Sequence, residues 1–162
     1  RALSMLVNKG LDAELICVGG PVTRDDKVYV KELKNYIKEK GLNRKVKFVG
    51  PISNTESVKY FQKADVFVHS SETGSLDKVV LESMACGTPV VTSNDSAVPI
   101  LSKFNSNCVF IKNDEKDLAR KVAYFYGLKD DMHNLQERLR EEVVTNHNIV
   151  DLINRVSSHI KE

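Results

Sequence analysis

The sequence lacks a long apolar segment, since no apolar run in its 162 residues approaches the roughly 20 that a membrane-spanning helix needs. It also lacks a strong charge of one sign, because 24 basic and 22 acidic residues leave a net charge of +2. We therefore expect no nucleic-acid partner. With 41% hydrophobic and 28% charged residues and no repeats, the composition is typical of one globular domain.

Cysteine is scarce, and Cys17, Cys86 and Cys108 include no C-x-x-C pair. Each lies in or beside an apolar run, so we expect buried, reduced thiols in a cytoplasmic protein and no metal site. The first residues, RALSMLVNKG, have the apolar spacing and final glycine of the latter part of an amphipathic helix. We therefore expect the chain, a single domain over residues 1–162, to begin inside a larger protein.

Short apolar segments alternate with helical periodicity along the chain. Strands are predicted at residues 13–18, 46–49, 65–69 and 89–92, with helices between them and three further helices at residues 114–126, 130–143 and 149–160. Strands that are apolar on both faces and alternate with helices predict an α/β fold with a Rossmann-like parallel sheet flanked by helices. Ligands bind such sheets at the carboxyl ends of the strands.

The loop at residues 70–77 lies at that edge, between a predicted strand and a predicted helix. A helix N-terminus has free N–H groups and about half a positive charge, which favour phosphate. Gly74 and Ser75 let the backbone approach a ligand, and Ser75 or Asp77 is suited to cap the helix. The same residues also suit an ordinary strand-to-helix turn.

Lys78 and Glu82 stand four residues apart on one face of this predicted helix. A lysine in the first turn opposes the helix dipole unless an anion shares the site. Glu82 is flanked by the core positions Leu81 and Met84, where a carboxylate usually has a designated hydrogen-bond partner. Taken by themselves, Lys78 and Glu82 are explained by an ordinary ion pair. Taken together with the preceding loop, they favour a site that binds an anion.

The segment KVVLESMACGTPVV, residues 78–91, resembles the donor-binding helix of the GT-B glycosyltransferases of family 4, in which an E-G-F-G loop leads into L-E-A-M-A-C-G-x-P-V-V. YFQKADVFVHSS, residues 60–71, is similar to the helix and strand that precede that loop (A-D-V-x-V-x-P-S). LICVGGP and VKFVGP, residues 15–21 and 46–51, resemble the family's earlier strand ends. The resemblance implies the donor-binding half of a GT-B fold without its first strand and its acceptor-binding domain.

The resemblance also implies roles for individual residues. The second glutamate of the family's E-x7-E pair binds the ribose hydroxyls, which is Glu82 here. Backbone amides of the loop and first turn hold the diphosphate and sugar, and main chain after the second strand of the chain holds the base. The residues implied are Glu82, Gly74, Ser75, Leu76, Asp77, Lys78, Val79, Pro51 and Ile52. No cofactor or metal is expected, because basic groups and a helix N-terminus stabilise the leaving diphosphate.

One departure from the family concerns the first glutamate of the pair, which would fall at Gly74, while Glu72 lies two residues earlier. The family's contact to a hexose hydroxyl then falls to Asp77 or Glu72, and Lys78 adds a phosphate contact. The family's basic pair for the diphosphate lies partly upstream of this chain. We therefore assign no catalytic residue.

The function implied by the resemblance is a retaining glycosyltransferase that moves a sugar from a UDP- or GDP-sugar to a saccharide or glycolipid acceptor. Its partners would be the sugar donor, the acceptor and the missing N-terminal domain. The full-length protein would associate peripherally with the inner membrane face and act in polysaccharide or glycolipid assembly. This fragment alone is expected to be inactive. Two alternatives stay open: a non-catalytic nucleotide-binding or interaction module of the same fold, and a nucleotide-sugar epimerase-like domain.

Other classes of nucleotide and signalling domain fit less well. Gly19-Gly20-Pro21 is not the G-x-G-x-x-G of dinucleotide-binding domains, and Pro21 would remove an amide that faces phosphate. Asp65 lies at the start of its strand, whereas a receiver domain needs its aspartate at the end. His69, near the end of that strand, is expected either to reach the site or to be a structural histidine.

Overall fold

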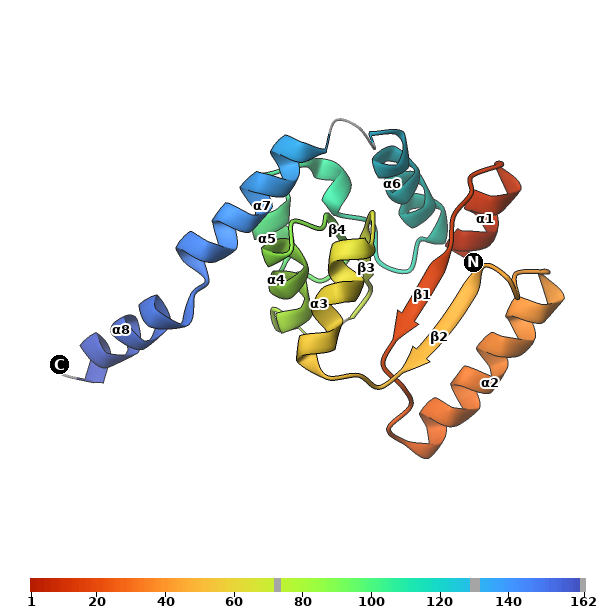
Figure 1. Ribbon diagram of the computed structural model, residues 1–162, viewed down its shortest axis with the longest axis horizontal. Helices are drawn as coiled ribbons and strands as arrows, with labels where there is room; N and C mark the ends of the chain where they lie inside the picture. Colours follow the sequence, from red (N-terminus) through yellow and green to blue (C-terminus); the bar gives the residue numbers. More distant parts are fainter. Residues whose placement is uncertain (72–73, 129–131, 161–162) are drawn as a thin grey trace. The chain divides into compact units, whose positions relative to one another are not determined.

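The computed structural model describes residues 1–71, 74–128 and 132–160 (Figure 1). The chain forms two compact units, Arg1–Ser57 and Val58–Glu162. Each unit has its own pair of parallel strands, so the predicted parallel α/β class is confirmed. Within the described residues, the strands form two separate sheets of two strands each, the first strand with the second and the third with the fourth.

The first unit contains α1 (Ala2–Asn8), β1 (Leu15–Val18), α2 (Arg24–Glu39) and β2 (Val46–Gly50). β1 and β2 pair in parallel, and the register shifts between Cys17 and Val18. A capping box starts α2: the Thr23 side chain accepts from the Asp26 N–H at 3.1 Å, and the Asp26 carboxylate accepts from the Thr23 N–H at 2.8 Å. These bounds lie within two residues of the predicted ones.

The strands of the first unit are less buried than the sequence predicts. Ile16 is 47% exposed and Val18 is 43% exposed, and α2 has no buried residue. Within the described residues β1 and β2 pair only with each other, and a two-stranded sheet has too little cover to bury both faces. The prediction of strands buried on both faces is therefore wrong for this unit.

Helix α3 (Asn54–Lys63) spans the boundary between the two units. It begins at Asn54 and is capped by Ser53, the residue before it. The Ser53 hydroxyl accepts from the Glu56 N–H at 3.3 Å, and the Glu56 carboxylate accepts from the Ser53 N–H at 3.0 Å. This reciprocal pair satisfies two of the free N–H groups at the start of the helix.

The second unit is built around β3 (Phe67–His69) and β4 (Val90–Thr92), which pair in parallel from Phe67 opposite Val90 to His69 opposite Thr92. Between them lies α4 (Lys78–Ala85), which packs against α7 (His133–Asn146). These elements enclose a hydrophobic core formed by Val80, Met84, Val90, Val91, Ala97, Leu101, Cys108, Phe110, Phe125, Met132 and Leu139. The predicted burial of a parallel strand on both faces is confirmed here for β4.

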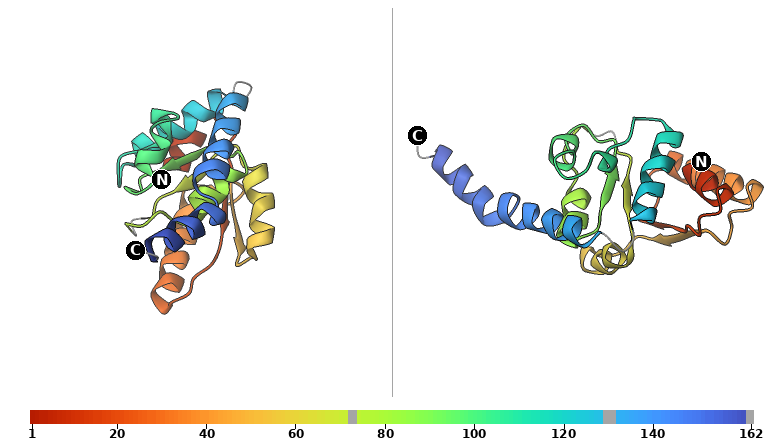
Figure 2. Two further views of the ribbon diagram at one scale, coloured as in Figure 1. Left: turned by 90° about the vertical axis from the view of Figure 1, so that its left-hand side faces the viewer. Right: turned by 90° about the horizontal axis from the view of Figure 1, so that it is seen from above.

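After β4 the chain forms α5 (Val98–Leu101), the 3-10 turn η1 (Ser106–Cys108) and α6 (Glu115–Gly127), and it ends in α7 and α8 (Ile149–Ile160). Asp114 caps α6, at the predicted start of this helix, and accepts from the Lys116 and Asp117 N–H groups at 2.9 Å each. Figures 1 and 2 show α8 as the continuation of α7. In the described part of the chain, no helix combines the length and apolarity needed to cross a bilayer.

The three cysteines are free thiols, as predicted. Cys108 is buried, whereas Cys17 and Cys86 are only partly buried, so the expectation of three buried thiols is correct for one of them. Burial raises the pKa of all three, that of Cys108 to about 12. A thiol with a raised pKa carries little thiolate at neutral pH.

Candidate functional site

The loop before α4 is fixed through its backbone carbonyls. The Ser96 hydroxyl donates to the Gly74 carbonyl at 2.7 Å, and the Asn94 side-chain N–H donates to the Ser75 carbonyl at 3.0 Å. Gly74 has φ +73, in the left-handed region that other residues rarely adopt. A glutamate at position 74 would be strained in this conformation, which gives a physical reason for the departure from the family pattern.

Asn94 is itself held in place on the segment after β4. It is 1% exposed, and its side-chain oxygen accepts from the Ser96 N–H at 2.9 Å and from the Ala97 N–H at 3.2 Å. Its own N–H donates to the Thr92 hydroxyl at 3.0 Å. Sequence reasoning missed Asn94 and Ser96; the available signal was a polar run, TSNDS, directly after a strand at the carboxyl edge.

Asp77 occupies the N-cap position of α4, but its carboxylate makes no cap hydrogen bond. Asp77, one of the two predicted caps, therefore takes the N-cap position, but its carboxylate lies 3.0 Å from His69 Nε2 in place of a cap hydrogen bond. His69 is 7% exposed, and its Nδ1 lies 3.1 Å from the Thr92 hydroxyl. Because a carboxylate only accepts, His69 Nε2 carries a proton and donates it to Asp77.

Both ring nitrogens of His69 thus have protein partners, which agrees with the structural reading, and its contact with Asp77 brings it to the loop before α4. The bond to His69 fixes the Asp77 carboxylate at the carboxyl end of β3, beside the start of α4. Asp77 is one of the two residues predicted to replace the family's first glutamate. The other, Glu72, lies outside the described residues.

The start of α4 presents backbone donors. The N–H groups of Leu76, Lys78 and Val79 have no hydrogen-bond acceptor among the described residues, and the Asp77 side chain makes no cap bond there. Lys78 and Val79 are exposed. These amides carry the partial positive charge of the helix N-terminus, and with the Lys78 ammonium they suit an anion such as a phosphate group.

Glu82 lies one turn further along α4, partly buried. Its carboxylate makes no hydrogen bond or ion pair with any residue that the structure describes, and the pair with Lys78 that would explain both residues structurally is not formed there. A partly buried carboxylate without a protein partner is costly unless a ligand or water supplies donors. Glu82 is therefore suited to accept hydrogen bonds from hydroxyl groups of a ligand.

Pro51 and Ile52, the residues implied for the base, belong to the first unit and are described only within it. The ends of β1 and β2 run together there, since the Gly19 N–H donates to the Gly50 carbonyl at 2.9 Å. A Cβ on Gly20 would lie 3.2 Å from the Pro51 ring, so glycine allows this close approach. Pro51 is exposed and Ile52 is partly buried, which leaves a surface at the carboxyl ends of both strands.

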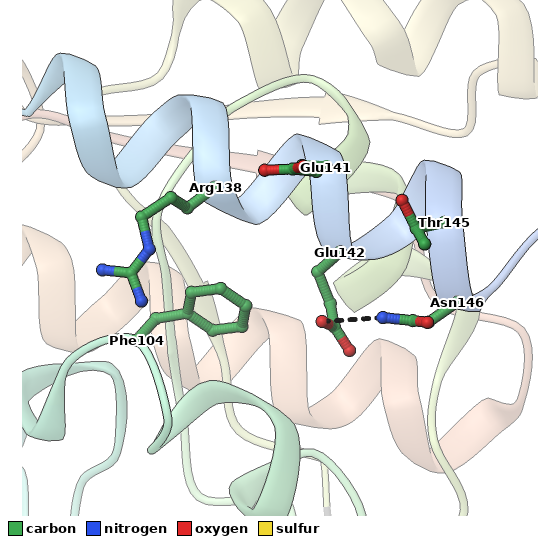
Figure 3. A pocket seen from close by; sticks show the side chains of 6 residues that line it. All are labelled: Phe104, Arg138, Glu141, Glu142, Thr145 and Asn146. Atoms are coloured by element: carbon green, nitrogen blue, oxygen red, sulfur yellow. Dashed lines mark hydrogen bonds between the residues drawn. The ribbon is translucent and has the colours of Figure 1, made fainter.

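A groove on the second unit lies along α7 and shares no residue with the loop before α4 (Figure 3). Arg138 lies over the Phe104 ring at 5.3 Å from its centre, and Glu142 accepts from the Asn146 side chain at 3.0 Å. Arg138 and Glu142 are thus engaged with their neighbours. No group of three histidine, cysteine, aspartate or glutamate residues within the described ranges could hold a metal ion.

Parallel strands, a helix N-terminus and, among the described residues, open amides and a carboxylate without a partner are the features expected of an α/β protein that binds a nucleotide or sugar phosphate. The chain belongs to the glycosyl transferases group 1 family, whose model matches residues 1–142. The family that the sequence motifs resemble is thereby confirmed.

Curated relatives agree with this assignment. Alpha-monoglucosyldiacylglycerol synthase of Streptococcus pneumoniae is 29% identical over 146 residues, which cover 82% of this chain and 32% of the relative. A D-inositol 3-phosphate glycosyltransferase of Streptosporangium roseum is 30% identical over 112 residues, 68% of this chain and 26% of the relative. The chain thus spans about a third or less of the length of these relatives.

Solved structures share the fold. HepE of Anabaena, crystallised with UDP, matches with a TM-score of 0.84 and 18% identity over 99% of this chain and 44% of that chain. A glycosyltransferase of Rickettsia africae matches with a TM-score of 0.82 and 23% identity over 98% of this chain and 41% of that chain. The predicted half of a GT-B fold is confirmed by these likenesses.

Proposed function

We propose that this chain is the donor-binding part of a retaining glycosyltransferase that transfers a sugar from a UDP- or GDP-sugar to a saccharide or lipid-linked acceptor. Glu82 accepts hydrogen bonds from the ribose hydroxyls in this proposal. The amides at the start of α4, with Lys78, hold the diphosphate, and main chain near Pro51 and Ile52 holds the base. No metal or cofactor takes part.

The observation that carries the proposal is the partly buried Glu82 carboxylate, which has no protein partner within the described residues. Two ribose hydroxyls would supply the donors that the protein does not. The open amides of Leu76, Lys78 and Val79 one turn earlier offer the complementary donors for an anion. A nucleoside diphosphate carries both kinds of group on one molecule.

The names of the relatives support the reaction class and the acceptor. One makes a glucosyldiacylglycerol and the other glycosylates an inositol phosphate by name, so the family's acceptors include a lipid and a phosphorylated polyol. The UDP in the HepE crystal supports a nucleoside diphosphate donor. We extend the lipid-linked or saccharide acceptor, and a place at the inner membrane face, to this protein as part of the proposal.

Calorimetric titration of the complete natural protein with UDP, GDP and ADP tests the donor site. We expect one nucleotide to bind saturably and Glu82→Ala to raise its Kd by roughly 10- to 100-fold, the usual effect of losing hydrogen bonds to a charged group. Glu137→Gln, on the exposed face of α7, is the matched control and should leave the Kd unchanged.

The 2′-deoxy form of the same nucleotide makes the test specific for the ribose. Wild-type protein should bind the deoxy nucleotide more weakly, and Glu82→Ala should lose less affinity for it than for the ribonucleotide. An equal loss of affinity for both nucleotides would show that Glu82 does not bind the 2′-hydroxyl of the ribose. The absence of binding to all three diphosphates would reject the donor site itself.

A non-catalytic nucleotide-binding module is the second candidate, favoured by Gly74 at the position of the family's first glutamate. The two functions differ in turnover. An enzyme should release its nucleoside diphosphate from the matching nucleotide sugar when an acceptor is present, whereas a module would bind the nucleotide without releasing product.

A further inference from the structure

The Ser75–Leu76 peptide has a fixed orientation. The Ser75 carbonyl points at Asn94, whose side-chain N–H donates to it at 3.0 Å. In a planar trans peptide the C=O and the following N–H point in opposite directions. The Leu76 N–H is therefore directed away from Asn94, and it has no acceptor among the described residues.

The preceding peptide is oriented in the same way. The Gly74 carbonyl accepts from the Ser96 hydroxyl at 2.7 Å, so the Ser75 N–H is also directed away from the segment after β4. Both carbonyls are thus held on one side of the loop, and both amides face the other side. A loop that turned either peptide over would present a carbonyl oxygen in place of an N–H.

The two donors that hold these carbonyls are built into the second unit. Asn94 is buried, and three bonds fix it: its oxygen accepts from the Ser96 and Ala97 N–H groups, and its own N–H donates to Thr92. Thr92 ends β4, whose residues are all buried. The chain of contacts therefore connects the loop before α4 to the fully buried strand β4.

We propose that Asn94 and Ser96 are positioning residues that keep the amides of the loop before α4 turned toward the diphosphate of the donor. This inference rests on the proposed function, because it takes the diphosphate site from there. Neither residue touches the ligand in this proposal. Asn94 acts through its hydrogen bond to the Ser75 carbonyl, and Ser96 acts through its hydrogen bond to the Gly74 carbonyl. They determine whether the loop attracts an anion or repels it, since a carbonyl oxygen facing a phosphate is unfavourable.

Two substitutions separate this role from the packing of the loop. Ser96→Ala removes only the hydroxyl that holds the Gly74 carbonyl. Asn94→Asp keeps the shape and the oxygen that accepts from Ser96 and Ala97, but it puts a carboxylate oxygen against the Ser75 carbonyl. Ser102→Ala, an exposed serine at the end of α5, is the matched control for the loss of a hydroxyl.

The experiment compares a nucleoside diphosphate with its nucleoside in the complete natural protein. The ligands are UDP and uridine, or the corresponding diphosphate and nucleoside if the wild-type protein binds GDP or ADP instead. Binding is measured by NMR from the shift of the Leu76 amide signal. We expect Ser96→Ala to raise the Kd of the diphosphate by roughly fivefold and Asn94→Asp by more. The Kd of the nucleoside should stay within twofold in both variants, because only the diphosphate faces the amides.

The remaining outcomes overturn the inference in different ways. Equal weakening of diphosphate and nucleoside would assign the two residues a purely structural role. Unchanged diphosphate binding in Ser96→Ala, with wild-type binding intact, would reject the inference and leave the proposed function standing. A wild-type protein that binds none of the three diphosphates would reject the proposed function and the inference with it. Ser96→Ala decides the matter if Asn94→Asp does not fold.

Discussion

The two pairs of parallel strands differ sharply in burial. Val90 and Val91 of β4 are 0% exposed, whereas Ile16 and Val18 of β1 are 47% and 43% exposed. Both pairs end in loops that the sequence predicts as ligand contacts. The loop before α4 is therefore attached to a buried core, whereas the loop after β2 follows strands with little cover.

Burial of the strand ends matters for a binding site because it fixes donors before the ligand arrives. His69, Thr92 and Asn94 connect the loop before α4 to β3 and β4 through buried hydrogen bonds. Pro51 and Ile52 follow a strand without a comparable network of described side chains. We therefore expect the diphosphate half of the site to be preorganised more than the base half.

Truncation of a core side chain should give the largest contrast between the units. Phe125 is 0% exposed in the core of the second unit, and Phe125→Ala should lower the free energy of unfolding by about 3–5 kcal/mol. Ile16→Ala, on half-exposed β1, should cost about 1 kcal/mol, because less apolar surface is lost from burial. Urea denaturation followed by circular dichroism measures both.

Equal losses of unfolding free energy in Phe125→Ala and Ile16→Ala would contradict the difference in burial between the two units, since they would mean that β1 is covered in the natural protein. That result would be informative, because it would place β1 in an interior that these residues alone do not form. A loss for Ile16→Ala larger than that for Phe125→Ala would show that the first unit carries most of the stability.

Asp117 gives the next largest effect. Its carboxylate is 7% exposed and accepts from the Ile111 N–H at 2.8 Å and from Arg120 Nη2 at 2.5 Å. Burial raises the pKa of Asp117, but these donors lower it more, so the pKa lies below its ordinary value. Asp117→Asn should lower the free energy of unfolding at pH 7 by about 2 kcal/mol, the usual size for hydrogen bonds to a charged group.

The pH dependence has a definite sign. Because the folded pKa of Asp117 is depressed, its stabilisation is complete above the unfolded pKa of roughly 3.9 and is lost as the pH falls through the folded pKa. The difference between wild type and Asp117→Asn should therefore shrink as the pH falls below about 4. Asp26→Asn at the exposed cap of α2 should show a smaller difference, and a pH-independent gap for Asp117→Asn would contradict the assignment.

Most of the fold follows from local pattern. Alternating apolar strands and amphipathic helices predict nearly every element within two or three residues, because periodicity and capping residues are local properties. The burial of β1 was predicted wrongly, since burial depends on which strands are neighbours and not on the strand's own composition. The missing cap hydrogen bond of α4 was not predictable from local sequence either, because the Asp77 carboxylate accepts from His69, which lies on a different element.

The site was predictable where it depends on backbone position and not where it depends on distant contacts. Glu82 and the amides of the loop follow from a strand, a loop and a helix in sequence order. Asn94 and Ser96 lie about twenty residues from the carbonyls that they hold, and the register of β3 with β4 brings them there. No local signal encodes that register, so a single sequence indicates a polar loop without its function.

Thiol labelling gives the smallest effect and the most local view of the two units. Cys108 of the second unit is buried and has a pKa of about 12, whereas Cys17 of the first unit is partly buried with a pKa that burial raises less. A maleimide-type reagent at pH 8 should therefore label Cys17 well before Cys108, because labelling needs both access and thiolate. Mass spectrometry of Cys86→Ser protein over time separates the two sites.

Cys108 should react only at the rate of global unfolding. Phe125→Ala should therefore accelerate the labelling of Cys108 and leave the labelling of Cys17 unchanged. Parallel acceleration at both cysteines would show that the two units unfold as one.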